Sequence, residues 1–178
     1  VKVSGDIKAV KGEKTFNLEY DYSEMGVGKF KEEAKYIEDG VAEREKKEAG
    51  KGKVFKEGWF GARERVYQPK FETLFNKGLA KLGITGSSDN ASAKYTLIVK
   101  TTYTEPGFNI GIAKKAASIN VEYIFVESGT ENVVAKYKQA GIPGAQAMGY
   151  DFDVSTRVSE SYAKSGKMIA AMMAKALK

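Results

Sequence analysis

The sequence predicts an α+β fold: a two-layer sandwich in which a mixed sheet of four to five strands carries helices on one face. Residues 94–138 contain three runs in which apolar and polar residues alternate, which is the period of half-buried strands. Residues 16–22 alternate as strictly and predict one earlier strand. Three further segments repeat apolar residues at helical spacing. The predicted order is therefore β-α-α-β-β-β-α, in a single domain spanning residues 1–178.

The N-terminal third is expected to begin with a strand and a surface helix. Residues 7–10 are a candidate hairpin partner for the strand 16–22. A helix is predicted over about residues 29–47 from a narrow apolar stripe, and Gly40 should weaken its middle. Residues 49–61 are rich in glycine and lysine and are predicted to be irregular. Their load of bulky apolar side chains is unusual for a loop: Val54, Phe55, Trp59 and Phe60.

A second helix and a linker lead into the three-stranded region. Pro69 suits the first turn of a helix, where its missing N–H costs nothing, so a helix is predicted to begin there and to end at Gly83. Residues 86–92 are polar and read as a linker. The strand 16–22 is expected to lie parallel to its neighbour through a right-handed crossover. The first of the three later strands should present one face made of Tyr95, Leu97, Val99, Thr101 and Tyr103.

The chain is expected to finish with a helix that lies across the sheet. Residues 140–149 have the composition of a flexible connection, and either Asp153 or Ser155 can cap the helix that follows. That helix should reach Leu177 and close one continuous core with the sheet. The predicted core residues are Phe71, Leu74, Phe75, Val121, Tyr123, Phe125, Tyr162 and Ile169.

The composition excludes several kinds of chemistry. The chain has no His and no Cys, so Ser-His-Asp and Cys-His catalysis, disulfides and zinc-finger sites are excluded within it. Carboxylate, Lys, Tyr or Ser–Lys chemistry and an oxygen-ligand cation site survive. The net charge is +6, and because the charges are interspersed along the chain we interpret the excess as an ordinary solvated surface.

Three pairs of neighbouring carboxylates are candidates for acid–base chemistry or for a cation site. They are Glu32–Glu33, Glu38–Asp39 and Asp151/Asp153. The first two pairs share a helix face with lysines, where ion pairing in solvent is the ordinary role. The third pair straddles a helix start, where the helix dipole favours negative charge. We therefore predict no catalytic residues, no metal site and no cofactor.

One cluster is a candidate binding site. Aromatic and arginine side chains are the commonest ingredients of binding hot spots, and they gather in one short stretch. The stretch holds Trp59, Phe60, Arg63, Arg65 and Tyr67. The alternative is that Trp59 and Phe60 fold under the loop and complete the core.

Several segments together carry a resemblance to known proteins. They are residues 16–22, 67–82, 95–99 (Tyr-Thr-Leu-Ile-Val), 106–111 and 117–128. This succession of an early strand, an aromatic-rich helix, a Tyr-x-Leu-x-Val strand, a glycine-rich link and an alternating strand resembles a group of bacterial envelope families, many of them lipoproteins. The fold that the resemblance implies is similar to the N-terminal domain of TolB and to the periplasmic domain of the curli-secretion lipoprotein. It implies a role in envelope assembly and supplies no site motif.

These observations favour a non-catalytic exported domain, periplasmic or associated with the outer membrane, that acts by binding or assembly. The expected partner is an envelope protein or a second copy of the chain, with membrane contact only through a lipid anchor upstream of Val1. A chain that does not start with Met agrees with a removed signal peptide or a trimmed product. One alternative is a carboxylate- or Lys-dependent enzyme acting on a polysaccharide or phosphoester. A nucleic-acid-binding domain is weaker, because the open sheet face lacks a pair of aromatic residues for base stacking.

Overall fold

The computed structural model describes residues 1–109, 113–145 and 154–178. In these ranges seven strands form one open mixed sheet in the order β1-β9-β8-β5-β2-β4, with β3 paired beside β5. The strands of this sheet are β1 (Lys2–Gly5), β2 (Thr15–Asp21), β3 (Gly26–Val27), β4 (Thr85–Ser87), β5 (Tyr95–Glu105), β8 (Ser118–Glu127) and β9 (Val133–Pro143). A separate small hairpin is made of β6 (Phe108–Asn109) and β7 (Lys114–Lys115).

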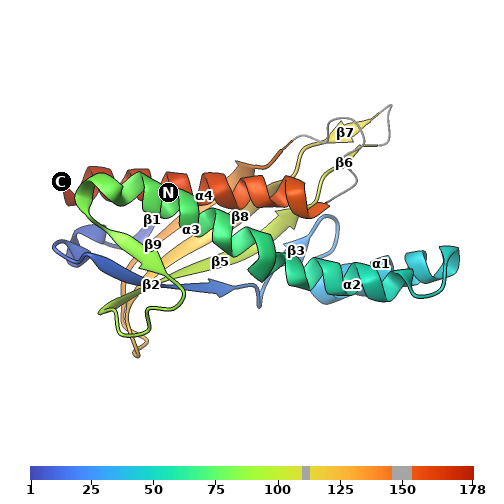
Figure 1. Ribbon diagram of the computed structural model, residues 1–178, viewed down its shortest axis with the longest axis horizontal. Coiled ribbons are helices and arrows are strands. Elements are labelled where there is room, and N and C mark those ends of the chain that lie inside the picture. Colours follow the sequence, from blue (N-terminus) through green and yellow to red (C-terminus); the bar gives the residue numbers. More distant parts are fainter. Residues whose placement is uncertain (110–112, 146–153) are drawn as a thin grey trace.

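The helices fall into two groups with different places in the molecule. The α-helices are α1 (Glu33–Lys47), α2 (Lys51–Ala62), α3 (Gln68–Leu79) and α4 (Val154–Leu177). Shorter turns are the 3₁₀-helices η1 (Ile7–Val10) and η3 (Ala80–Leu82) and the π-helical turn η2 (Arg63–Tyr67). Helices α3 and α4 cover one face of the sheet, whereas α1 and α2 project beyond it as a hairpin (Figure 1). We call α1 with α2 the arm, and the sheet with α3 and α4 the body. The body confirms the predicted α+β sandwich.

The strand pairing confirms the predicted arrangement of β2, β5, β8 and β9 and adds three short strands, β1, β3 and β4. β8 is antiparallel to both β5 and β9, and β2 is parallel to β5, as the crossover requires. Residues 86–92, predicted to be a linker, begin inside β4, which pairs with β2. The side chain of Asn76 on α3 holds this edge, because it accepts from the Gly86 N–H at 2.7 Å and donates to the Gly86 carbonyl at 2.9 Å. β9 also extends into the predicted connection at 140–149 and ends at Pro143.

A β-bulge in β5 overturns one predicted face. Thr101 pairs with Val121, but Tyr103 pairs with Asn120, so one extra residue lies on β5 between them. The extra residue moves Tyr103 off the core face and brings Thr104 onto it. Tyr103 is accordingly only half-buried, and its hydroxyl donates to the Gly28 carbonyl at 3.2 Å.

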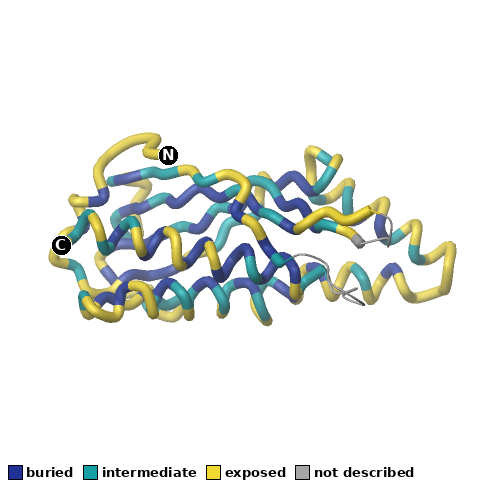
Figure 2. Tube along the Cα trace, turned by 90° about the horizontal axis from the view of Figure 1, so that it is seen from above, coloured by how far each residue is buried: buried dark blue, intermediate teal, exposed yellow. Residues whose placement is uncertain are grey.

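The main core lies between the sheet and the pair α3 and α4 (Figure 2). Seven of the eight predicted core residues are buried in one cluster, while Leu74 is only half-buried. Phe125 is fully buried at the centre of β8, with its ring 6.3 Å from that of Phe16 in an edge-to-face arrangement. Helix α4 packs on this core through Tyr162 and Ile169, as predicted.

The N-terminal segment does not form the predicted hairpin with β2. Residues 7–10 are the 3₁₀-helix η1, capped by the Asp6 carboxylate, which accepts from the Lys8 N–H. The preceding residues form β1 and pair with β9 at the opposite edge of the sheet. Gly5 makes the change of direction with a φ of 64°, a left-handed conformation that glycine adopts without strain. η1 then buries Ile7 and Val10 in the main core.

The arm contradicts the prediction of an irregular segment at residues 49–61, most of which lie in helix α2. Its glycines serve close helix packing: a Cβ on Gly40 would lie 2.5 Å from the Phe55 ring, and one on Gly52 would lie 2.8 Å from Val41. Gly50, with a φ of 86°, makes the turn from α1 to α2. Helix α1 begins at Glu33, later than predicted.

Pro69 lies in the first turn of α3, as predicted, but α3 is not a separate helix, because helical structure runs without a break from α2 through η2 into α3. Pro69 follows the π turn, in which the Gln68 N–H donates to the carbonyl of Arg63, five residues back. A proline inside a helix lacks an N–H and crowds the preceding turn, and the widened turn accommodates this.

The start of α4 lies beside residues outside the described ranges. The structure places Val154 in the helix, but the capping role predicted for Asp153 and the Asp151/Asp153 pair fall outside the described residues. In the part of the chain that is described, no helix combines the length and the apolar character needed to cross a membrane.

Candidate functional site

The five residues of the predicted binding cluster lie on α2 and η2, at the junction of arm and body, and the fold separates them. Trp59 and Tyr67 are buried, Arg63 is half-buried, and Phe60 and Arg65 are exposed. The cluster is therefore not one surface. The alternative of a core role holds for Trp59 but not for Phe60, whose exposed fraction is 37%.

Trp59 belongs to a second, small core inside the root of the arm. It is buried with Met25, Val27 and Ile37, and its ring centre lies 4.8 Å from that of Tyr36. The indole N–H donates to Glu33 Oε1 at 2.6 Å, so its polar atom is satisfied on the side of α1. Trp59 thus links α2 to α1 through a hydrogen bond and an aromatic contact.

Arg63 is occupied by contacts within the protein. Its guanidinium forms a hydrogen-bonded ion pair with Glu33, the carboxylate that also receives Trp59. It also lies 4.1 Å from the ring centre of Tyr22. Burial raises the pKa of Tyr22 to about 12, although the nearby Arg63 lowers it in part. Tyr22 is therefore neutral at physiological pH, and the contact is a cation–π interaction.

Tyr67 joins the arm to the body. Its ring stacks on Tyr162 of α4 with 4.9 Å between centres and planes 6° apart. The Tyr162 hydroxyl is hydrogen-bonded to Thr101 of β5 at 2.8 Å, and burial raises its pKa well above the ordinary value. The stack is a structural connection from η2 through α4 to the sheet.

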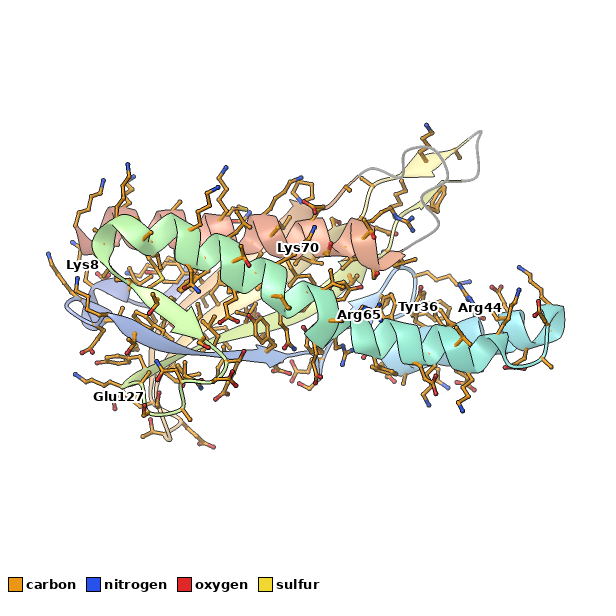
Figure 3. All side chains as sticks on the ribbon, in the orientation of Figure 1. Lys8, Tyr36, Arg44, Arg65, Lys70 and Glu127 are labelled. Atoms are coloured by element: carbon orange, nitrogen blue, oxygen red, sulfur yellow. The ribbon has the colours of Figure 1, made fainter. Side chains whose placement is uncertain are left out.

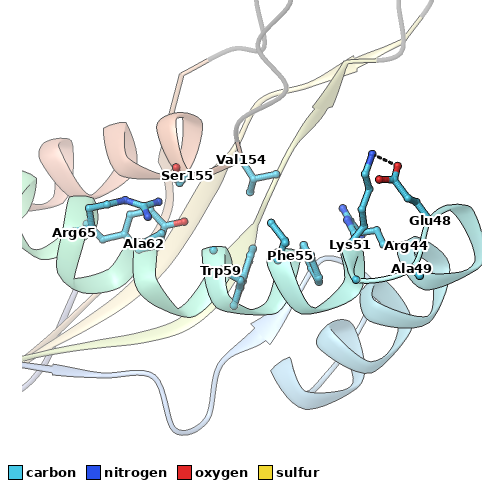
Figure 4. A pocket seen from close by; sticks show the side chains of 14 residues that line it. Arg44, Glu48, Ala49, Lys51, Phe55, Trp59, Ala62, Arg65, Val154 and Ser155 are labelled. Atoms are coloured by element: carbon cyan, nitrogen blue, oxygen red, sulfur yellow. Dashed lines mark ion pairs between the residues drawn. The ribbon is translucent and has the colours of Figure 1, made fainter.

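An open groove of about 960 Å³ lies on the side of α2 that faces the start of α4 (Figure 4). We call it the α2 groove. Its apolar lining includes Val54, Phe55 and Trp59 of α2 and Val154 of α4. Val54 is 68% exposed, so its side chain is accessible to a ligand in the groove. The volume and the apolar lining are those of ligand-binding sites.

The rim of the α2 groove is mostly cationic. Arg44 lies 3.9 Å from the Phe55 ring centre and donates to the Gly40 carbonyl at 3.0 Å, which holds its guanidinium at the edge. Lys51 pairs with Glu48 at 2.6 Å, and Arg65 is exposed at the body end. This arrangement can bind an apolar group and can contact polar or anionic atoms beside it.

Of the five residues in the predicted binding cluster, three line this groove: Trp59, Arg65 and Tyr67. Val54 and Phe55 were noticeable in the sequence as bulky apolar residues in a glycine-rich stretch. Because that stretch was predicted to be irregular, the sequence did not indicate that they share one face of a helix with Trp59. Arg44 and Val154 come from α1 and α4, and only the folded chain brings them beside α2.

In each of the two carboxylate pairs that the structure describes, one carboxylate has a partner within the protein. Glu33 accepts a hydrogen bond from Trp59 and forms an ion pair with Arg63. Glu38 forms an ion pair with Lys35 at 2.9 Å on the exposed face of α1. Among the described residues, no three side chains of His, Cys, Asp or Glu are grouped so that they could hold a metal ion. The alternative of a carboxylate- or Lys-dependent enzyme is not tested by these contacts and stays a prediction.

Comparisons with protein-family models, with curated proteins and with solved structures found no significant match. The resemblance to envelope families therefore stays a prediction from the sequence.

Proposed function

We propose that this protein is a non-catalytic binding domain, exported to the bacterial envelope, that holds an apolar segment of a partner protein in the α2 groove. The observation that supports it is the groove itself, where exposed Val54 and half-buried Phe55 meet Val154 of the body. Export rests on the sequence resemblance alone. A binding role also agrees with the lack of His and Cys, the side chains that most small enzymes use.

The shape of the groove favours a peptide segment. It follows α2 from Lys51 to Ala62, a length of about 16 Å at the helical rise, which is three turns of helix. An amphipathic partner helix places its apolar side chains at this spacing and buries them in such grooves. The cations Arg44 and Arg65 near the two ends would then contact carboxylates on the partner.

The test is photo-crosslinking from single positions on α2. A photoreactive residue at Val54, in the groove, should capture a defined partner from an envelope extract. The same residue at Lys56 is the control, because Lys56 is exposed on α2 but does not line the groove. Equal capture from both positions, or from neither, would contradict the proposal.

A variant gives the second measurement. Val54→Asp should abolish capture from a second groove position, Gly58, while leaving the free energy of unfolding within about 0.5 kcal/mol, as exposed positions usually do. Trp59 is the only tryptophan and lines the groove, so its fluorescence should change when the captured partner's segment is added as a synthetic peptide. An unchanged emission spectrum at saturating peptide would place the contact elsewhere.

A further inference from the structure

The excess positive charge of this protein is concentrated in its helical layer. Residues 68–82 and 154–178, which contain α3, η3 and α4, hold eight basic and two acidic residues. This excess of six equals the net charge of the whole chain, so the remaining residues are balanced. The charges are interspersed along the sequence, but the fold gathers the uncompensated ones on one layer. Interspersion along the sequence therefore does not mean an even distribution over the surface, and the interpretation as an ordinary solvated surface stays a prediction.

The exposed lysines form two neighbouring stripes. On α4, Lys164, Lys167 and Lys175 are exposed and recur at helical spacing, so they share the side away from the core, and the exposed Lys178 follows directly after the helix. On α3 and η3 the matching positions are the half-buried Lys70 and the exposed Lys77 and Lys81. We call these seven residues the lysine face. Figure 3 shows long side chains extending outward from both helices, with Lys70 labelled.

The two stripes form one surface because α3 and α4 pack very closely. A Cβ on Gly166 would lie 2.2 Å from the carbonyl oxygen of Phe71, and a Cβ on Gly78 would lie 2.6 Å from the Cβ of Ala170. Small residues at the crossing bring the helix axes together, which places the outer faces side by side. Met168, 39% exposed, lies among the lysines of α4.

The lysine face is not neutralised from within the described residues. There, only Lys70 has a carboxylate within ion-pair distance, that of Glu160. On the open face of the sheet, by contrast, lysines have carboxylate partners. Lys100 forms an ion pair with Glu24 at 2.7 Å, and Lys136 and Lys138 both form ion pairs with Glu122. One face of the molecule therefore satisfies its charges internally, and the other leaves cations for an external anion.

We propose that the lysine face binds the surface of an anionic lipid bilayer. Lysine is a flexible point charge suited to diffuse attraction by many headgroups, whereas arginine is the usual choice for bidentate contacts with nucleic acid. The one arginine of the layer, Arg157, is buried, and the apolar Met168 suits contact with the headgroup boundary. This inference does not depend on the α2 groove.

The direct test is sedimentation with vesicles of phosphatidylcholine, with and without phosphatidylglycerol. We expect binding only to the anionic vesicles and loss of binding as salt is raised. The triple variant K164Q/K167Q/K175Q should bind about a hundredfold more weakly, at about fivefold per lysine. The control K46Q/K47Q/K53Q removes the same charge from exposed positions of the arm and should bind within about fivefold of the unaltered protein.

Equal losses in the two triple variants would overturn the proposal, because net charge alone would then explain binding. Binding to a DNA or RNA duplex without binding to anionic vesicles would overturn it in favour of a nucleic acid. Because the chain has no cysteine, an environment-sensitive dye can be attached at Met168→Cys or, as control, at Lys53→Cys. Anionic vesicles should raise the emission of the first and leave the second unchanged. A reversed pattern would place the arm against the membrane.

Discussion

The body and the arm bury their apolar side chains by different means. In the body, two helices close over a sheet, and rings such as those of Phe16 and Phe125 are fully buried. In the arm, two helices pack mainly on each other, and the small core at its root is completed by the polar set of Glu33, Trp59 and Arg63. Hydrophobic burial therefore dominates the body, whereas the arm depends more on close glycine contacts and cation–ring pairs. We expect the arm to open at lower free energy than the body.

The largest expected effect separates the two cores directly. Phe125→Ala removes a fully buried ring from the body and should lower the free energy of unfolding by about 3–5 kcal/mol. Phe55→Ala removes a half-buried ring from the arm and should cost about 1–2 kcal/mol. Urea unfolding followed by circular dichroism measures both. Equal costs would show that the arm is as tightly packed as the body.

The next effect concerns the crossing of α3 and α4. Gly166→Ala places a methyl group against the backbone of Phe71, which cannot move without separating the helices. The expected cost is about 2–3 kcal/mol, the upper part of the range for overpacking. Thermal unfolding of the single variant measures it. A variant as stable as the original protein would mean that this crossing tolerates a wider spacing.

The same substitution in the arm should have a smaller effect whose sign depends on position. Gly40→Ala presses on the ring of Phe55 and should cost about 1 kcal/mol, less than at Gly166 because a side chain can shift. Gly58→Ala meets nothing within 4 Å and should stabilise α2 by about 0.5–1 kcal/mol. A Gly40→Ala variant at least as stable as the original protein would contradict the close contact between α1 and α2.

The smallest expected effect is a dependence on pH at the open face of the sheet. Burial by itself raises the pKa of Glu122, but hydrogen bonds and charge attraction from Lys136 and Lys138 outweigh it, and the pKa lies below its ordinary value of 4.5. Glu122 therefore stabilises the fold above about pH 4.5, and this contribution is lost as the pH falls through the lowered pKa. We expect less than about 1 kcal/mol for such a partly exposed ion pair.

The variant Glu122→Gln isolates that contribution. Its free energy of unfolding should depend less on pH between 5 and 3 than that of the original protein, and urea titrations at the two pH values measure the difference. Identical pH dependence in both proteins would show that the lysine pairs do not shift this carboxyl group.

How much of the structure could be predicted follows the same division. Strict alternation identified β2, β5 and β8, because a strand with one buried face alternates apolar and polar residues along the sequence. The bulge after Thr101 left no such mark, so the predicted side of Tyr103 was wrong. Residue pattern alone therefore described the body well.

In the arm, local pattern was misleading. Helix α2 contains Gly52, Gly58 and Gly61, which by propensity predict a loop. Gly52 is favourable only because Val41 and Glu45 of α1 lie against it, which is information from another helix. The α2 groove and the lysine face were missed for a related reason: each depends on which helices become neighbours.

The continuous helical path from Lys51 to Leu79 has a mechanical consequence. At the usual rise, its 29 residues form a rod roughly 40 Å long, half of it in the arm and half seated on the sheet. Such a rod transmits load instead of absorbing it, except at the wider turn η2. A pull applied to the tip of the arm would therefore reach the stack of Tyr67 on Tyr162 and strain the centre of the fold.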